Sequence, residues 1–392
     1  MLTHYIPSLS CRRFLLALAA VLVAATVNAQ TITSFTPGDL AVYTTTSGSA
    51  LGSAATAVYL DEYTTSGAFV GSMNISAAAI SDSTQLTASG TASSEGQITF
   101  NGQYIALTGY TGAIGTSGIA STTSTADPRI VASISMNGTT NFISLGTTPY
   151  SGNNIRGAYA SGNSSIWAVG AGSGTNGVWY TSGSTPVNLV SGGIRAVNAF
   201  NGQLFIDTGT AIQSVGSGLP TSGANQTTTT LATLTGSSPS GNAFAMFDLG
   251  AGPTQFGENT LYVANSAGSS ANTTAIEKFS YNGTSWVNTG DVSIGGIGNS
   301  TVGALGLTGE TIAGSVVLYG TSSNGANGTI FTFTDSTGYD GTVSGTATAL
   351  AIAGTDQAFR GIVVVPEPAS LAIALGASAL AFAAWRRSRF PG

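Results

Sequence analysis

Short apolar runs separated by turns rich in glycine, serine, threonine and asparagine extend through most of the chain. In the clearest units one apolar run ends in a small or polar turn and a second run follows, in segments 96–109, 156–170, 196–209 and 244–265. Asn-Gly favours the positive φ angles of tight hairpins, so hairpin turns are predicted at Asn101-Gly102 and Asn201-Gly202. No segment of the central part of the chain has a convincing helical period.

A third and a fourth strand are predicted after these pairs. Third strands are expected in segments 177–182, 275–283 and 329–335, and fourth strands in 187–192, 286–294 and 346–354. Four short strands in roughly every 40 to 60 residues are typical of the blades of a β-propeller. Five complete blades would begin near Gly96, Ile155, Ile194, Ala243 and Val302.

A further blade is expected to combine the two ends of this central part. Segment 358–366 has the pattern of a first strand with no strands after it, whereas three early segments have the pattern of second, third and fourth strands without a first: 38–45, 57–67 and 68–76. We therefore predict that residues 362–364 pair with the strand containing residues 40–43 and close the ring. The predicted fold is an all-β propeller of six four-stranded blades, with seven blades as the alternative.

Two other all-β folds compete with the propeller. A right-handed β-helix would show a stricter period of about 20 to 30 residues. A pair of β-sandwiches would require a linker in the middle of the chain. The nearest linker candidate, the threonine-rich segment 221–230, lies within one predicted blade and is expected to be a long loop.

Residues 1–29 have the pattern of an export signal. Arg12 and Arg13 precede an apolar core, and small residues precede the expected signal peptidase site between Ala29 and Gln30. An uncleaved N-terminal anchor is the alternative. Both interpretations predict that the following part of the chain is exported.

The C-terminal segment 366–392 combines a short motif, an apolar run and a basic end. Pro366, Glu367 and Pro368 are followed by an apolar run at 369–385 and then by Arg386, Arg387 and Arg389. A helix over that run would span roughly 25 Å at about 1.5 Å per residue, the short end of what a bilayer requires. Because arginines resist translocation, the predicted orientation has the C-terminus in the cytoplasm. An ordinary buried helix is the alternative.

This order of features resembles the PEP-CTERM sorting signal of Gram-negative bacteria, which is processed by exosortase, a membrane-embedded cysteine transpeptidase-like enzyme. The resemblance covers only residues 365–389. It implies a sorting motif, a transmembrane helix that is removed after recognition, and an arginine cluster that retains the end at the membrane. It also implies exosortase and signal peptidase as partners and a location in the cell envelope, on the cell surface or in an extracellular matrix.

The absence of two residue types limits the chemistry of the body, residues 30–365. The only histidine and the only cysteine of the chain, His4 and Cys11, both lie in the expected signal peptide. The body therefore cannot form a disulfide, a thiolate nucleophile, a histidine or cysteine metal site, or a Ser-His-Asp triad. No cofactor and no metal site are predicted.

The charge of the body argues against nucleic acid as a partner. Five basic and fifteen acidic residues give the body a net charge of about −10. A basic groove for a phosphate backbone has no residues to build it.

Carboxylates are the remaining candidates for acid and base chemistry. Glycosidases use two of them, and the body offers Asp61, Glu62, Asp207, Asp248, Glu258 and Glu277. Asp61 and Glu62 are adjacent in a predicted strand and would point to opposite faces, so they make a poor pair. Asp207 and Asp248 are expected to be turn or hydrogen-bonding residues, and no enzymatic activity is predicted.

Three further groups of residues have two interpretations each. The segment 335–341 is expected to be a connecting loop, with a calcium site as the alternative. Aromatic residues at Trp167, Trp179, Tyr180 and Trp286 are expected to fill the space between sheets, with sugar binding as the alternative. Arg156, Arg195 and Arg360 recur at the start of first strands and are expected to bridge blades rather than to line a channel for an anion.

The combined prediction is an exported surface or matrix protein, sorted by exosortase, with a structural or recognition role for which a polysaccharide is one candidate ligand. The alternative is a carbohydrate-active hydrolase or lyase that uses carboxylates. A third prediction, equally consistent with the sequence, is a passive surface-layer or adhesive protein without a specific ligand.

Overall fold

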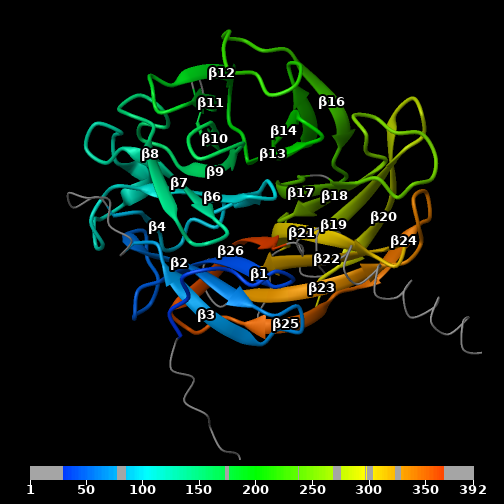
Figure 1. Cartoon of the computed structure of the whole chain (residues 1–392), viewed down its shortest axis with the longest axis horizontal. Coiled ribbons are helices and arrows are strands. Elements are labelled where there is room, and N and C mark those ends of the chain that lie inside the picture. The colour runs from blue at the N-terminus through cyan, green and yellow to red at the C-terminus, as the bar shows by residue number, and fades with distance from the viewer. Residues whose placement is uncertain are drawn as a thin grey trace, which may run out of the picture.

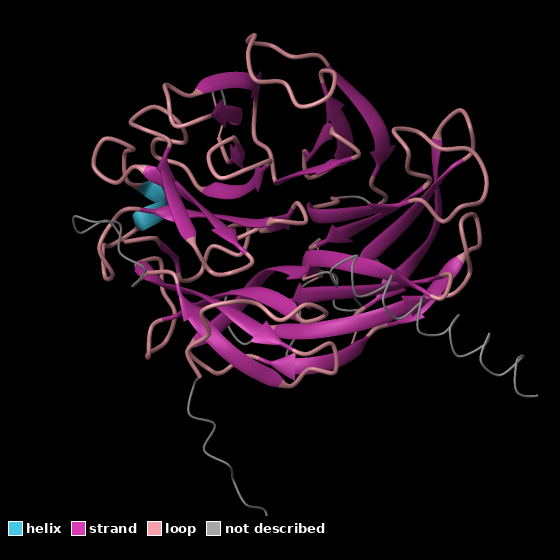
Figure 2. Cartoon of the chain, viewed as in Figure 1, coloured by secondary structure: helices cyan, strands magenta, loops and turns pink. Residues whose placement is uncertain are grey.

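The regular secondary structure of the described residues consists almost entirely of β-strands, which are joined by loops (Figure 2). The computed structural model describes residues 30–365 apart from 77–84, 173–175, 237, 268–274, 296, 298–302 and 323–327. Within these residues the one helical element is a 3-10 turn, η1 (Ile119–Ser121). The prediction of an all-β fold is confirmed.

The strands form five hydrogen-bonded sheets. The largest has nine strands, which are β26 (Gln357–Val364), β1 (Leu40–Thr46), β2 (Ala55–Tyr63), β4 (Thr87–Ser89), β6 (Tyr104–Tyr110), β7 (Arg129–Ser135) and β8 (Thr140–Ser144) in spatial order, with β3 (Phe69–Asn74) paired to β2 and β5 (Thr99–Phe100) paired to β6. The next two sheets follow chain order: β9 (Ile155–Ala160), β10 (Ile166–Gly170), β11 (Gly177–Thr181) and β12 (Val187–Ser191), then β13 (Ala196–Phe200), β14 (Gln203–Asp207), β15 (Ala211–Val215) and β16 (Thr228–Thr233).

In the last two sheets, one strand from the chain segment of one sheet pairs with the other sheet. One contains β17 (Gly241–Phe247), β18 (Thr260–Asn265), β19 (Ile276–Tyr281), β20 (Trp286–Ser293) and β24 (Val343–Thr346), and the other contains β21 (Ala304–Ile312), β22 (Ser315–Ser322), β23 (Thr329–Asp335) and β25 (Thr348–Ile352). The chain leaves β23, adds β24 in parallel to the outer strand β20 of the neighbouring sheet, and returns as β25. The sequence did not predict this excursion, and it did not predict the short connecting strand β4.

The sheets are arranged as a β-propeller-like ring (Figure 1). Their innermost strands contact one another in a closed circuit that runs β5, β9, β13, β17, β21, β26 and back to β5. The segment that leads into β5 runs parallel to β9, to which an isolated bridge joins it between Gln97 and Gly157. The first strands therefore surround a common centre, and the later strands of each sheet lie farther out.

The two ends of the described chain meet in one sheet. β26 pairs antiparallel with β1, with Leu40 opposite Val364 and Val42 opposite Ile362. Figure 1 shows the red β26 beside the blue β1. This confirms the predicted pairing of residues 362–364 with residues 40–43.

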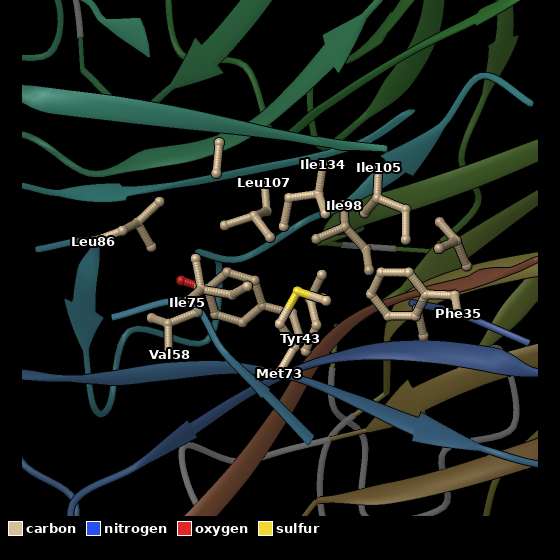
Figure 3. Packing of buried hydrophobic residues seen from close by; sticks show 14 of the residues in the cluster. Phe35, Tyr43, Val58, Met73, Ile75, Leu86, Ile98, Ile105, Leu107 and Ile134 are labelled. Carbon is tan, nitrogen blue, oxygen red and sulfur yellow. The ribbon is translucent and has the colours of Figure 1, made fainter. Parts of the chain in front are cut away.

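The core consists of apolar clusters between neighbouring sheets. Figure 3 shows the one nearest the N-terminal strands, where residues such as Tyr43, Val58, Leu107 and Ile134 interdigitate and are all fully buried. Full burial of such a side chain is worth roughly 1.5 to 3 kcal/mol relative to exposure. Alternating apolar positions on the strands supply both faces of each sheet, because successive side chains point in opposite directions.

The two predicted hairpins differ in their turns. Asn201 and Gly202 have φ angles of 47° and 74° and form a two-residue turn between Phe200 and Gln203. At the other site the loop spans 101–103 between β5 and β6, and only Gly102 has a positive φ. The Asn101 side chain accepts backbone hydrogen bonds from residues 103 and 104. Both turns are present where they were predicted.

The prediction of a loop at 221–230 is wrong for its last three residues. Residues 228–230 already belong to β16, which pairs with β15. β-Branched threonine suits an outer, half-exposed strand, and threonine-rich composition alone does not separate such a strand from a loop.

Candidate functional site

A cavity of about 270 Å³ lies at the centre of the ring. Its walls come from β5, β13, β17, β21 and the end of β26, which are distant in sequence. The lining includes four aromatic residues and several polar ones: Phe100, Phe200, Phe244, Phe247, Gln97, Asn198, Thr308 and Glu310. Its size is close to the lower end of small-molecule sites, which are about 300 to 1,000 Å³.

The aromatic residues stand near the ends of the inner strands. Phe100, Phe200 and Phe247 are each half-buried and end β5, β13 and β17. The ring of Phe200 packs against the rings of Phe205 and Phe244, with centroid distances of 6.1 and 6.0 Å. Such packing fixes the ring while leaving part of its surface accessible from the cavity.

Polar groups complete the same end of the cavity. The amide oxygen of Asn198 accepts the N–H of Ala199 at 2.9 Å. The hydroxyl of Thr308 accepts the N–H of Val364 at 3.3 Å and so ties β21 to β26. Glu310 is half-buried and its Oε1 accepts a long hydrogen bond from Tyr319 at 3.5 Å. Aromatic faces with an amide, a hydroxyl and a carboxylate suit a ligand that has both apolar faces and hydroxyl groups.

The sequence did not single out these lining residues. Phe100, Phe200 and Phe247 share one signal, an aromatic residue directly before the turn or loop that ends an inner strand. Glu310 has no such signal, because its position in the cavity depends on the packing of β21 beside β26.

The arginines at the starts of first strands bridge elements and do not line this cavity. Arg156 on β9 donates from Nη1 to the carbonyl of Ile194, just before β13, at 3.1 Å. Arg360 on β26 donates from Nη2 to the carbonyl of Gly90 at 2.8 Å. The predicted bridging role is confirmed for these two residues. Burial raises the pKa of Asp207, and the charge of the nearby Arg195 opposes that rise.

A buried carboxyl group stands between the closing strand and its neighbours. Glu95 accepts hydrogen bonds from Ser89 N–H at 3.0 Å, from the Tyr110 hydroxyl at 2.5 Å and from Asn154 Nδ2 at 2.7 Å. Burial raises the pKa of Glu95 to about 7, although these bonds and the charge of Arg360 oppose the rise. The carboxyl group therefore changes charge near neutral pH.

Five of the six candidate carboxylates accept a hydrogen bond from a backbone N–H or a side-chain amide. Asp207 accepts the N–H of Gly209 at 2.6 Å, and burial raises its pKa to about 7. Asp248 accepts Gly250 N–H, Glu62 accepts Thr36 N–H, Glu277 accepts Thr235 N–H and Glu258 accepts Asn201 Nδ2. The turn and hydrogen-bonding roles predicted for Asp207 and Asp248 are confirmed. None of the six candidates lines the central cavity.

The sixth, Asp61, lies on the opposite face of β2 from Glu62. Its carboxylate accepts a hydrogen bond from the Ser72 hydroxyl of β3. Because Glu62 bonds instead to the segment before β1, the two adjacent carboxylates do not form a pair, as predicted.

The segment 335–341 surrounds a lysine ammonium group. Lys278 Nζ lies 2.8 Å from Asp335 Oδ2 and donates to Thr337 Oγ1 and to the carbonyls of Gly338 and Gly341 at 3.0, 2.6 and 3.0 Å. These oxygen atoms, which would be the ligands of a calcium ion, instead contact the ammonium group of Lys278 on β19. Within the described part of the chain no group of three or more His, Cys, Asp or Glu residues is placed to hold a metal ion.

The candidate sugar-binding aromatics are packed inside the protein. Trp167, Trp179 and Trp286 are buried, while Tyr180 is half-buried. The indole N–H of Trp167 donates to the carbonyl of Pro220 at 2.7 Å, and that of Trp286 donates to Gln255 Oε1 at 2.6 Å. Their packing role is confirmed.

The sorting residues predicted from the sequence lie outside the described residues. These are Ala29, Pro366, Glu367, Pro368, Arg386, Arg387 and Arg389, together with the apolar run 369–385. Gln30 is described, is exposed, and its carbonyl accepts the N–H of Ser72 at 2.8 Å. Among residues 30–365, with the gaps given above, no helix has the length and hydropathy needed to cross a membrane.

No family model and no curated protein matches the chain. Two solved structures are similar at low scores. The N-terminal domain of Nup159 has a TM-score of 0.31 and 8% identity, over 65% of this chain and 60% of that one. A S. cerevisiae complex of a Dbp5 variant bound to Nup159, a Gle1 variant, IP6 and ADP has a TM-score of 0.30 and 9% identity, over 65% of this chain and 59% of that one. The chain therefore spans less than two thirds of each of these two chains.

Proposed function

We propose that this chain is an exported recognition protein that binds a glycan segment in its central cavity without cleaving it. The observation that carries the proposal is the lining of that cavity, where half-buried phenylalanines stand beside Asn198, Thr308 and Glu310. Sugar rings have apolar faces that pack on aromatic side chains and hydroxyl groups that bond to amides and carboxylates. This lining offers both kinds of contact.

We further infer that the ring has six blades. The nine-stranded sheet divides at β4 into one blade of β26, β1, β2 and β3 and a second of β5, β6, β7 and β8. The other four sheets then supply one blade each, and each blade contributes one strand to the inner circuit. This grouping rests on the strand order and on the contacts between inner strands.

The carboxylates of the cavity favour binding over hydrolysis. Glycosidases of the common type place two carboxyl groups about 5 to 9.5 Å apart across the scissile bond. Glu310 is the only Asp or Glu among the described residues that line the central cavity. A carbohydrate-active hydrolase or lyase therefore remains the second proposal, and it would need a further acid or base.

The place of action is proposed from the two ends of the sequence. The pattern of residues 1–29 supports export by signal peptidase, and the resemblance at 365–389 supports sorting by exosortase to the envelope, the surface or an extracellular matrix. A membrane anchor would be transient in this scheme. The glycan partner and the sorting partners rest on separate observations.

The binding proposal is tested with the purified full-length protein on a panel of immobilised polysaccharides. Glu310→Gln and Asn198→Ala each remove one polar contact of the cavity, and Asp340→Asn removes an exposed carboxylate elsewhere as a matched control. We expect retention on at least one glycan, at least tenfold weaker binding for both cavity variants, and unchanged binding for the control. Each tenfold loss corresponds to about 1.4 kcal/mol.

Three results would contradict this proposal. Undiminished binding by both cavity variants would remove the central cavity as the site. Release of sugar products that Glu310→Gln abolishes would establish the hydrolase or lyase instead. Absence of retention on every glycan would support the passive surface protein.

A further inference from the structure

A second cavity, of about 420 Å³, lies on one face of the N-terminal strands. We call it the β2 pocket. It is lined by three aromatic residues, one carboxylate and four other polar residues: Tyr59, Tyr63, Phe69, Asp61, Thr44, Thr46, Ser72 and Gln357. It shares no lining residue with the central cavity.

Strand register brings these side chains together. Tyr59, Asp61 and Tyr63 alternate along β2 and therefore share one face. On one side Thr44 of β1 lies opposite Tyr59. On the other side β3 places Ser72 opposite Asp61 and Phe69 opposite Tyr63. The carboxylate thus stands in the middle of the face, with a tyrosine on each side of it along the strand.

The carboxylate of Asp61 is buried, and among the described residues no basic side chain forms an ion pair with it. The residue is 5% exposed, and its carboxylate accepts a hydrogen bond from the Ser72 hydroxyl. Burial raises the pKa of Asp61, while the hydroxyls of Ser72 and Thr44 oppose the rise. No basic residue is among the described residues that line the β2 pocket. A buried carboxylate is costly unless it is paired, so a cationic ligand would supply a missing partner.

The aromatic rings are suited to the same kind of ligand. Tyr63 packs edge-to-face against Phe69 and Phe359, with centroids 5.4 and 5.8 Å away. Tyr59 is half-buried, and its hydroxyl accepts a hydrogen bond from Asn74 Nδ2 at 3.2 Å. Tyrosine and phenylalanine faces attract ammonium groups through the negative charge density of their rings, and more strongly where water is excluded.

We propose that the β2 pocket binds an organic ammonium group, with the cation against Asp61 and the attached carbon frame between Tyr59 and Tyr63. The ammonium group belongs either to an amino sugar or to a small free amine, and the chemistry of recognition is the same. This proposal does not rest on glycan binding in the central cavity, since the two sites have separate residues.

Calorimetric titration of the purified full-length protein tests the proposal with three probes. Glucosamine carries a protonated amine, N-acetylglucosamine has the same ring without the charge, and tetramethylammonium has the charge without the ring. We expect glucosamine to bind at least tenfold more tightly than N-acetylglucosamine. Asp61→Asn is expected to abolish that preference, whereas Asp340→Asn, which removes an exposed carboxylate, leaves it unchanged.

A second variant separates binding from folding. Tyr59→Leu changes a half-buried aromatic ring while retaining Asp61, and we expect it to weaken glucosamine binding at least threefold with a thermal unfolding midpoint close to wild type. Equal binding of glucosamine and N-acetylglucosamine, or undiminished binding by Asp61→Asn, would overturn the proposal. Tetramethylammonium that binds as tightly as glucosamine would identify a small amine as the ligand, and a preference for glucosamine would identify an amino sugar.

Discussion

The backbone N–H of Gly361 donates to the backbone carbonyl of Gly96 at 2.9 Å. This bond connects the C-terminal strand β26 to the segment that leads into β5. A Cβ atom on Gly361 would lie 2.5 Å from both the carbonyl oxygen of Gly96 and the backbone nitrogen of Ile98. The inner strands therefore approach each other here at a distance that only glycine permits.

Gly361→Ala is expected to destabilise the ring at its closure. The new methyl group meets backbone atoms that cannot rotate away, and overpacking of this kind typically costs about 1 to 3 kcal/mol. Urea unfolding measures the change in the free energy of unfolding. Gly52→Ala is the control because nothing lies within 4 Å of its added Cβ. Equal stability of the two variants would contradict the tight approach of β26 to β5.

Lys278→Met is expected to lower the free energy of unfolding at pH 7 by about 3 to 5 kcal/mol, since it leaves the buried carboxylate of Asp335 without its cation. Asp335 is 2% exposed and also accepts a hydrogen bond from the Tyr262 hydroxyl at 2.5 Å. Denaturant titration gives the value. A double variant that adds Asp335→Asn should recover part of the loss, and a single-variant loss under about 1 kcal/mol would argue against the ion pair.

Glu95 is expected to make the protein less stable as pH rises from about 4.5 to about 7. Its pKa is raised from 4.5 to about 7 in the folded protein, so the folded state keeps a proton that the unfolded chain has lost in this window. The stabilisation is complete below pH 4.5 and is lost as pH passes through 7. At 1.36 kcal/mol per pH unit, it amounts to about 3 kcal/mol.

The measurement compares unfolding free energies at the two ends of this pH window. Glu95→Gln cannot titrate, so the decrease should be smaller than in the wild type by about 3 kcal/mol. Part of the decrease in unfolding free energy with pH should remain in the variant, because the pKa values of Asp207 and Glu258 are also raised to about 7. Asp340→Asn should reproduce the wild-type slope, and an unchanged slope in Glu95→Gln would contradict the prediction.

Replacement of Pro366, Glu367 and Pro368 by alanine is expected to block sorting. The resemblance at 365–389 implies that exosortase recognises this motif before the tail is removed. Apparent mass and cell fractionation are then compared with those of the wild type and of Asp340→Asn. The variant should keep its full apparent mass and stay at the inner membrane. Normal processing and delivery would remove the sorting prediction.

Local features of the fold were predictable where short-range preferences decide them. Asn201-Gly202 forms its hairpin because both residues tolerate positive φ angles, and the flanking strands pair with their nearest neighbours in sequence. The repeated start of the inner strands also allowed residues 362–364 to be matched with residues 40–43. Threonine-rich residues 228–230 were misplaced because strand and loop have similar composition there.

Candidate sites were harder to predict because their residues come from several strands. Phe100, Phe200 and Glu310 meet only after the inner strands surround a common centre. No sequence pattern singled out Lys278, and the segment 335–341 that surrounds it was expected to be a connecting loop, with a calcium site as the alternative. The packing role predicted for the tryptophans is confirmed, although sequence alone left sugar binding as an alternative, since an aromatic residue on a strand can face a neighbouring sheet or a ligand.

The sequence by itself determined the all-β composition of the body, the alternating strands and their turns, and the absence of histidine and cysteine chemistry. These depend on residue type and on spacing between close neighbours. Only the tertiary structure decided that Asp61 shares a pocket with Tyr59 and Phe69, and that Gly361 meets Gly96. Such contacts depend on the register between strands and on the closure of the ring, which bring together residues that have no local influence on one another.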